Sequence, residues 1–282
     1  MNTINRRQFI KGLVGVGIDA VLGERKPLIL CIDGISYTDT INESLRLSRE
    51  LSELSGCQTK FTYFINTVSL FETIKGGSTL GCSSKQDISK RLELMSKAIE
   101  EGHEIGSHTV RHYDGGKNGK NWSKQQWVDE LSEFDGHIEK LFFKNGRPYK
   151  AVGFRAPYLS YNDAMYEALR ELGYQYDTSH AGDFLRMHFG IKVIGVPQYI
   201  RDNKCKLLGM DYNWHLAGIS NSELERMLKK EIEIKKAVII SMHSQKFYNG
   251  GKAYWDTVVE FIKANLHKIK LMSMCEYAAM VL

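Results

Sequence analysis

Residues 28–65 contain an apolar run LILCI (28–32), an amphipathic segment INESLRLSRELSEL (41–54) and a second apolar run FTYFI (61–65). The two runs predict buried strands, and the segment between them predicts a helix. The same alternation continues to the C-terminus. Further strands are expected at 103–107, 151–154, 174–176, 191–196, 207–210, 237–242 and 269–272, and further helices over 87–101, from 123, from 163, from 220, over 253–266 and at the C-terminus. This order predicts an α/β protein in which βα units surround a parallel sheet or barrel.

Polar residues that do not suit a core follow the carboxyl ends of the predicted strands. In an α/β barrel, the loops at this end converge and build the active site. We therefore expect one shared pocket lined by these side chains: Asp33, Asn66, His108, Arg155, Asp211 and His243.

Composition excludes several classes of protein. The chain has 282 residues, 43% hydrophobic and 25% charged, which is typical of a globular protein. Its net charge of +5 is too small to indicate a nucleic-acid partner.

No apolar run approaches the ~18 residues of a transmembrane helix. Five cysteines without a CxxC pair give no zinc-finger spacing and leave at least one thiol free, and neither their pairing nor the oligomeric state can be predicted.

The N-terminus has the order of an export signal. A weakly apolar stretch at 12–22 follows the basic segment Asn5-Arg6-Arg7-Gln8-Phe9-Ile10-Lys11, and charged residues come after it. The paired arginines resemble the bacterial twin-arginine signal. Asp19 interrupts the stretch and no AxA cleavage site follows. We expect residues 1–23 to direct export to the periplasm or outside the cell, and residues 24–282 to form a single catalytic domain. The alternative is a cytoplasmic chain with a basic tail.

Two histidines follow the strand predicted at 103–107. His108 and His112 lie four residues apart, so one helical turn would direct both imidazoles to one point. With Asp33 from another strand end, they form a ligand set that leaves coordination positions open and suits a catalytic divalent metal. Non-haem iron oxygenases use the same ligand types, so this set does not fix the reaction.

Five segments together resemble, in order, the motifs of the polysaccharide deacetylases, which are the NodB-homology, family-four carbohydrate esterases. They are Asp33-Gly34, His108-Thr109-Val110-Arg111-His112, Gly153-Phe154-Arg155-Ala156-Pro157-Tyr158, Asp211-Tyr212-Asn213-Trp214 and Ile240-Ser241-Met242-His243. The stretch 102–108 and Asp177-Thr178-Ser179 look similar to chitin deacetylases. The resemblance implies a distorted (β/α) barrel and a divalent metal, zinc or a relative such as cobalt. It also implies hydrolysis of acetyl groups on a sugar polymer, with N-acetylglucosamine-containing polysaccharide, chitin-like or peptidoglycan, as the expected substrate.

The resemblance also implies roles for single residues. Asp33, His108 and His112 would hold the metal, and His243 would be the general acid that protonates the leaving amine. The backbone N–H of Tyr158, after Pro157, would stabilise the oxyanion. Arg155 and Asp211 would orient the base and the acid, and Trp214 would form a wall of the acetyl pocket.

The first motif departs from the family pattern, which has two adjacent aspartates, a base followed by a metal ligand. Aligning the glycine makes Asp33 the ligand and puts Ile32 in the place of the base. Aligning by strand alternation makes Asp33 the base and puts Gly34 in the place of the ligand. We favour the first alignment, because two histidines with no carboxylate would be an unusual triad. Asp211 or Asp39 is then the candidate substitute base.

The single aspartate leaves a rival function open. Loss of a general base costs about 10²- to 10⁴-fold in rate, so slow turnover is as consistent with the sequence as none. The alternative is a carbohydrate-binding pseudoenzyme. A non-haem iron enzyme is a further alternative, although the Arg155–Tyr158 loop has no evident role in oxygen chemistry. Among loop aromatics, Tyr113, Trp122 and Tyr158 are candidates to stack on sugar rings.

Overall fold

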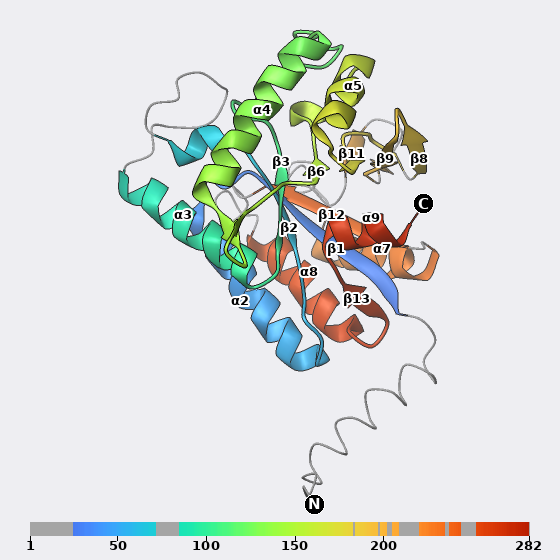
Figure 1. Cartoon of the computed structure of the whole chain (residues 1–282). Helices are drawn as coiled ribbons and strands as arrows, with labels where there is room; N and C mark the ends of the chain where they lie inside the picture. Colours follow the sequence, from blue (N-terminus) through green and yellow to red (C-terminus); the bar gives the residue numbers. More distant parts are fainter. Residues whose placement is uncertain are drawn as a thin grey trace, which may run out of the picture.

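The computed structural model describes residues 25–71, 85–182, 184–196, 198–201, 205–208, 220–234, 237–243 and 252–281. Its centre is a nine-stranded sheet that curls into a half-barrel, with helices packed around the outside (Figure 1). The expected export segment 1–23 and two expected site residues, Asp211 and Trp214, lie outside the described residues. The predicted distorted (β/α) barrel is confirmed.

Eight strands form the continuous path of this sheet, in the order β12-β1-β2-β3-β6-β7-β9-β8, and β13 pairs with the start of β1. All neighbours are parallel except β8 and β9. The bounds are β1 Lys26–Asp33, β2 Thr62–Ile65, β3 Glu104–Ser107, β6 Gly153–Phe154, β7 Tyr176–Asp177, β8 Leu185–His188, β9 Ile191–Ile194, β12 Val238–His243 and β13 Ile269–Leu271. The parallel order brings the carboxyl ends of all these strands except β8 to one end of the half-barrel.

Helices other than α9 cover the outer face of the sheet, and consecutive ones pack in pairs, such as α2 beside α3 and α4 beside α5 (Figure 1). Their bounds are α2 Thr38–Ser55, α3 Lys85–Glu100, α4 Lys124–Leu141, α5 Asp163–Leu172, α7 Asn221–Ile234, α8 Lys252–Asn265 and α9 Met274–Met280, with 3₁₀ turns η1 Thr67–Leu70 and η2 Pro157–Leu159. The capping box predicted at Ser123 is present, with Gln126 as its partner. The Ser220 hydroxyl likewise accepts from the Glu223 N–H at the start of α7.

Strand β1 explains why LILCI is apolar throughout. Leu28, Leu30 and Ile32 belong to the core between sheet and helices, whereas Ile29 and Cys31 belong to a second cluster inside the half-barrel. A parallel strand covered on both faces reads as a continuous hydrophobic run. Because side chains alternate along a strand, Asp33 continues the inner face and Ile32 does not.

Three strand pairings differ from the sequence expectation. Strand β8 was not predicted, because Leu185-Arg186-Met187-His188 mixes apolar and polar residues at an exposed sheet edge. The expected strand 207–210 is β11 (Cys205–Leu208), which pairs with β10 (Gln198–Arg201) in a separate two-stranded sheet. A short hairpin of β4 (Phe143–Lys144) and β5 (Arg147–Pro148) was also missed. Local pattern does not report which strands pair.

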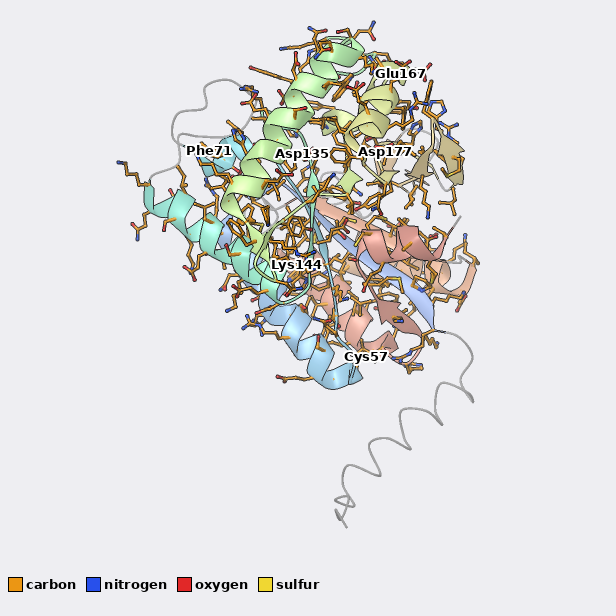
Figure 2. The ribbon with its side chains drawn as sticks, viewed as in Figure 1. Cys57, Phe71, Asp135, Lys144, Glu167 and Asp177 are labelled. Atoms are coloured by element: carbon orange, nitrogen blue, oxygen red, sulfur yellow. The ribbon has the colours of Figure 1, made fainter. Side chains whose placement is uncertain are left out.

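The two ends of the half-barrel lie far apart. Figure 2 places Cys57, just before β2, at one end, and Phe71 and Asp177, beyond or at the ends of β2 and β7, toward the other. Among the described residues, Cys31, Cys57 and Cys275 are free thiols. None of the helices described is long and apolar enough to cross a membrane.

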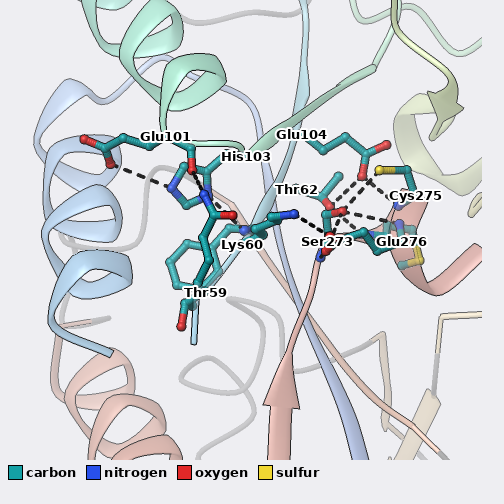
Figure 3. A network of polar contacts seen from close by, with 12 residues as sticks. Thr59, Lys60, Thr62, Glu101, His103, Glu104, Ser273, Cys275 and Glu276 are labelled. Carbon is teal, nitrogen blue, oxygen red and sulfur yellow. Dashed lines mark hydrogen bonds and ion pairs between the residues drawn. The ribbon is translucent and has the colours of Figure 1, made fainter. Parts of the chain in front are cut away.

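A polar network closes the amino end of the strands (Figure 3). The buried Glu104 carboxylate accepts hydrogen bonds from the Tyr176 hydroxyl (2.7 Å), the Thr62 hydroxyl (2.9 Å) and the backbone N–H of Cys275 (2.8 Å). These bonds connect β2, β3, β7 and the first turn of α9. Burying a carboxylate is tolerated here because its oxygens are satisfied.

Next to this network, His103 makes folding stability pH-dependent. Burial, with Lys60 and Arg49 nearby, lowers the pKa of His103 to about 4, while Nδ1 accepts the Phe61 N–H at 2.9 Å. Glu101 Oε2 lies 4.0 Å from Nε2. The unfolded chain, with a histidine pKa of about 6.5, binds the extra proton between these values, so this contribution is lost as pH falls from about 6.5 to about 4.

We expect the free energy of unfolding of the wild type to fall by roughly 3 kcal/mol more over that pH range than that of His103→Asn. Asparagine keeps an acceptor for the Phe61 N–H but does not titrate. Urea unfolding of both proteins at several pH values measures the difference. Parallel curves for the two proteins would contradict this assignment.

Candidate active site

The pocket begins with an ion pair inside the half-barrel. Arg155, directly after β6, donates from Nη1 to Asp33 Oδ1 at 2.7 Å and from Nη2 to the Thr178 hydroxyl at 3.3 Å. Its guanidinium also lies 4.5 Å above the centre of the Phe64 ring. Arg155 is 1% exposed and Asp33 is 7% exposed. The pair therefore fixes the carboxylate in a largely buried position, where loss of either partner would leave a poorly solvated charge.

His108 and His112 lie beside this pair, with their ring centres 4.9 Å apart. They do so in a loop and not in the expected helical turn, because Thr109 and His112 have φ values of 67° and 58°. His108 Nδ1 lies 2.7 Å from the backbone carbonyl of Arg155. A carbonyl can only accept, so Nδ1 carries the proton and Nε2 keeps its lone pair.

Burial lowers the pKa of His108 to about 3, and burial with the neighbouring His108 lowers that of His112 to about 3. Both imidazoles are thus neutral at pH 7, which is the form that binds a metal. Histidines that bind metals usually donate the N–H of one ring nitrogen to a carbonyl or carboxylate and use the other nitrogen as the ligand, and His108 has this arrangement.

Glu130 of α4 holds the loop that carries the two histidines. Its Oε1 accepts the consecutive backbone N–H groups of Val110 and Arg111, both at 2.9 Å, and its Oε2 lies 3.0 Å from Arg111 Nη1. Arg111 extends the network to Glu133 through two further bonds. Glu130 is buried, so these bonds replace its water shell.

Removing the Glu130 carboxylate should loosen the histidine pair. We expect Glu130→Ala to lower the free energy of unfolding by about 1.5–3 kcal/mol and to weaken zinc binding by about 10- to 100-fold. Glu130→Gln keeps an acceptor and should recover part of both losses. The matched control is Glu133→Ala, which removes only a half-exposed partner of Arg111 and should cost no more than about 1 kcal/mol. Calorimetric zinc titration and urea unfolding measure both effects; equal losses in the Glu130 and Glu133 variants would contradict this role.

The loop after Arg155 is held from the next strand. Ala156 N–H donates to the Ser179 hydroxyl at 2.7 Å, and Ser179 in turn bonds to the buried Asp177, whose pKa burial raises to about 6. Together with the Thr178 contact to Arg155, this gives Asp177-Thr178-Ser179 a supporting role. The sequence pointed to this stretch by resemblance only.

Pro157 starts η2 and is buried, and Tyr158 follows at the rim of the pocket. Tyr158 is 59% exposed, its ring lies edge-on to His112 with centres 4.9 Å apart, and its φ is 58°. Such backbone strain in a non-glycine residue concentrates at functional sites. Of the three expected aromatics, Trp122 is buried in the core and Tyr113 packs against Lys120, so Tyr158 is the one at the pocket.

One pocket brings these side chains together. Its lining consists of Asp33, His108, His112, Arg155, Ala156, Tyr158, Leu159, Val196, Ser241 and His243. Of the six side chains expected to share a pocket, Asp33, His108, Arg155 and His243 line it, and Asp211 lies outside the described residues. Asn66 is buried beside the pocket and donates to the His108 carbonyl at 3.3 Å. Asp39, a candidate substitute base, is exposed in the first turn of α2 and does not line the pocket.

The donor set suits a metal only in part. The two neutral imidazoles fit one, but no cluster of three His, Cys, Asp or Glu side chains within the described residues is placed to hold an ion. Asp33 accepts from Arg155 through Oδ1, and its part in the predicted triad stays a prediction.

A sequence profile of the polysaccharide deacetylase family matches residues 24–176, more than half of the chain. The chain belongs to this family. No curated protein matches it in sequence.

Solved structures of the polysaccharide deacetylase family share the fold. The Xyl-CE4 domain of a multidomain xylanase from the hindgut metagenome of Trinervitermes trinervoides has 16% identity and a TM-score of 0.53, with 90% of this chain and 89% of that chain covered. The peptidoglycan deacetylase PdaC from Bacillus subtilis has 14% identity and a TM-score of 0.52, covering 91% and 92%. A CE4 family pseudoenzyme from Bacillus anthracis also has 14% identity and a TM-score of 0.52, covering 90% and 66%. At these identities the likeness concerns the fold alone.

Proposed function

We propose that this member of the polysaccharide deacetylase family is a metal-dependent hydrolase that removes acetyl groups from N-acetylglucosamine-containing polysaccharide, chitin-like or peptidoglycan. The observation that carries the proposal is the single pocket in which a buried carboxylate, a neutral imidazole pair and a further imidazole meet. Hydrolysis of an amide needs a proton acceptor for water and a proton donor for the amine, and this pocket has candidates for both.

We propose Asp33 as the proton acceptor, which is the second of the two alignments of the first motif. Two observations support it. The inner face of β1 presents position 33 to the pocket, whereas Ile32 packs in the helix-facing core. Arg155 anchors Oδ1, which fixes the direction in which the other oxygen can accept a proton.

His108 and His112 would hold the metal, and the other positions would be filled by water and substrate. A bound divalent metal lowers the pKa of its water and polarises the carbonyl. The chain's own contribution is to keep both imidazoles neutral and oriented, through burial, the Arg155 carbonyl and Glu130. We take zinc as the first metal to test.

His243, the last residue of β12, lies next to Asp33 in the register and is the proposed general acid for the leaving amine. The backbone N–H of Tyr158 is the proposed oxyanion donor, and its exposed ring is available to a sugar unit at the rim. Asp211, as the partner that tunes the acid, and Trp214, as a wall of the acetyl pocket, remain predictions.

Export through the N-terminal residues 1–23 is part of the proposal, because the polymers named lie outside the cytoplasm. Replacing Arg6 and Arg7 by lysine should retain the protein in the cytoplasmic fraction of a bacterial host. Equal export of both forms would contradict it.

The test is acetate release by purified protein, supplied with zinc or cobalt, from chitooligosaccharides, peptidoglycan and acetylated xylan. Release from the first two substrates, lost in His108→Ala, is the expected result. Metal and polymer binding without acetate release would overturn the catalytic proposal and favour a carbohydrate-binding protein.

A further inference from the structure

Ser241 is a buried polar group in the pocket that the proposed mechanism does not use. It lies on β12, is 6% exposed and lines the pocket. Its hydroxyl has no hydrogen-bond partner within the described part of the chain. Buried hydroxyls are nearly always bonded to protein or to ordered water, so a substrate group that enters this part of the pocket has to replace the bond that water would make to Ser241.

The position of Ser241 defines which part of a substrate it meets. In the register of β1 and β12, Asp33 lies opposite His243, Cys31 opposite Ser241, and Ile29 opposite Ile239. The inner face therefore has three layers: the reactive pair, then Cys31 with Ser241, then an apolar floor that includes Ile29 and Ile239. Ser241 lies one layer inward from the residues proposed to act on the scissile bond.

The proposed mechanism sets which part of a substrate reaches this layer. In that mechanism the polymer stays at the open rim beside Tyr158, and the scissile carbonyl lies among Asp33, His243 and the imidazole pair. The part of the substrate that points inward, beyond the carbonyl, is then the tail of the acyl group. A methyl tail leaves the Ser241 hydroxyl without a partner, whereas a tail with a hydroxyl can both donate to it and accept from it.

We propose that Ser241 selects a hydroxylated acyl group, and that the preferred substrate is an N-glycolyl sugar, in which a hydroxyl replaces one hydrogen of the acetyl methyl. This inference rests on the proposed function. In the reaction, the oxygen of water forms a bond to the acyl carbon, the amide C–N bond breaks, and the amine takes a proton. The products are glycolate and a free amino sugar, and no oxidant or reductant is needed.

The experiment compares kcat/KM for matched N-glycolyl and N-acetyl glucosamine oligosaccharides. A buried polar group left unpaired costs about 1–3 kcal/mol, which corresponds to about 5- to 150-fold in kcat/KM, and we expect the wild type to favour the glycolyl substrate within that range. In Ser241→Ala the ratio should fall to about one. Ser160→Ala is the matched control, because the Ser160 hydroxyl is likewise buried without a partner in the described structure but does not line the pocket. This control should keep the wild-type ratio.

A second measurement separates this inference from the proposed function. Calorimetric titration with glycolate and with acetate reports on the same contact without turnover. If neither substrate is hydrolysed but glycolate binds more tightly in a Ser241-dependent way, the contact between Ser241 and the acyl hydroxyl is supported, whereas the proposed function and the substrate preference built on it fail. Equal kcat/KM values for the glycolyl and acetyl substrates in the wild type would overturn the inference. A glycolyl-to-acetyl ratio that Ser241→Ala leaves unchanged would overturn it as well.

Discussion

Substituting Asp33 by asparagine is expected to lower kcat/KM for acetate release by about 10²- to 10⁴-fold, because the amide cannot accept the proton of the attacking water. Zinc affinity should change by less than about tenfold, because in this account the two imidazoles hold the metal. The initial rate of acetate release gives kcat/KM, and calorimetric zinc titration of the same samples gives the zinc affinity. Asp129→Asn, on the exposed side of α4, is the control for loss of a carboxylate and should leave both quantities unchanged.

The opposite pattern would identify the other alignment of the first motif. If Asp33→Asn loses zinc as completely as His108→Ala does, Asp33 is a metal ligand and the proton acceptor has to be sought elsewhere. Asp211 is then the remaining candidate from the sequence. The two roles of Asp33 are thus distinguished by a binding measurement that does not depend on turnover.

Replacing Arg155 by methionine is expected to lower the free energy of unfolding by about 3–5 kcal/mol, because it leaves the Asp33 carboxylate buried without its partner. The double variant Asp33→Leu with Arg155→Met should recover most of that loss, since no unpaired charge remains. Urea unfolding of the three proteins gives the coupling. Arg147→Met, at an exposed position of β5, is the control and should have little effect.

A small loss in Arg155→Met, or a double variant less stable than the sum of the single changes, would contradict the buried pair. Activity is informative in the same series. The double variant is expected to fold and to be inactive, because it retains the shape of the pocket floor and lacks the proposed base.

Much of the fold follows from hydrophobic pattern alone. LILCI and FTYFI predict strands that the structure confirms within one or two residues, and the Ser123 capping box marks the start of α4. Strand β8 was not predicted from the sequence, because an exposed edge strand requires no alternation of apolar and polar residues. The pairing of β10 with β11 was not predicted either, because strand pairing depends on contacts between two segments and not on the sequence of either one.

The site was predictable in its membership more than in its geometry. Asp33, His108, Arg155 and His243 all lie at or just after the carboxyl ends of strands. A parallel barrel brings these ends together, so the sequence predicts that the four side chains share a pocket. Local pattern does not show that Asp33 bonds to Arg155, since the partner lies 122 positions away along the chain, and only the resemblance gave Arg155 a role in orienting the base. Glu130 and Ser241 were missed for a similar reason: one sits on a helix stripe and the other inside an apolar strand, where a single polar residue gives no pattern.

The most direct test of the central claim is the simultaneous measurement of acetate and free amine released from N-acetylglucosamine oligosaccharides. Wild-type protein loaded with zinc should release the two products in equal amounts. His243→Gln should reduce the rate by about 10²- to 10⁴-fold, while His137→Gln, whose side chain bonds Thr67 outside the pocket, should match the wild type. Absence of both products, from wild-type protein shown to bind metal and oligosaccharide, would contradict the account.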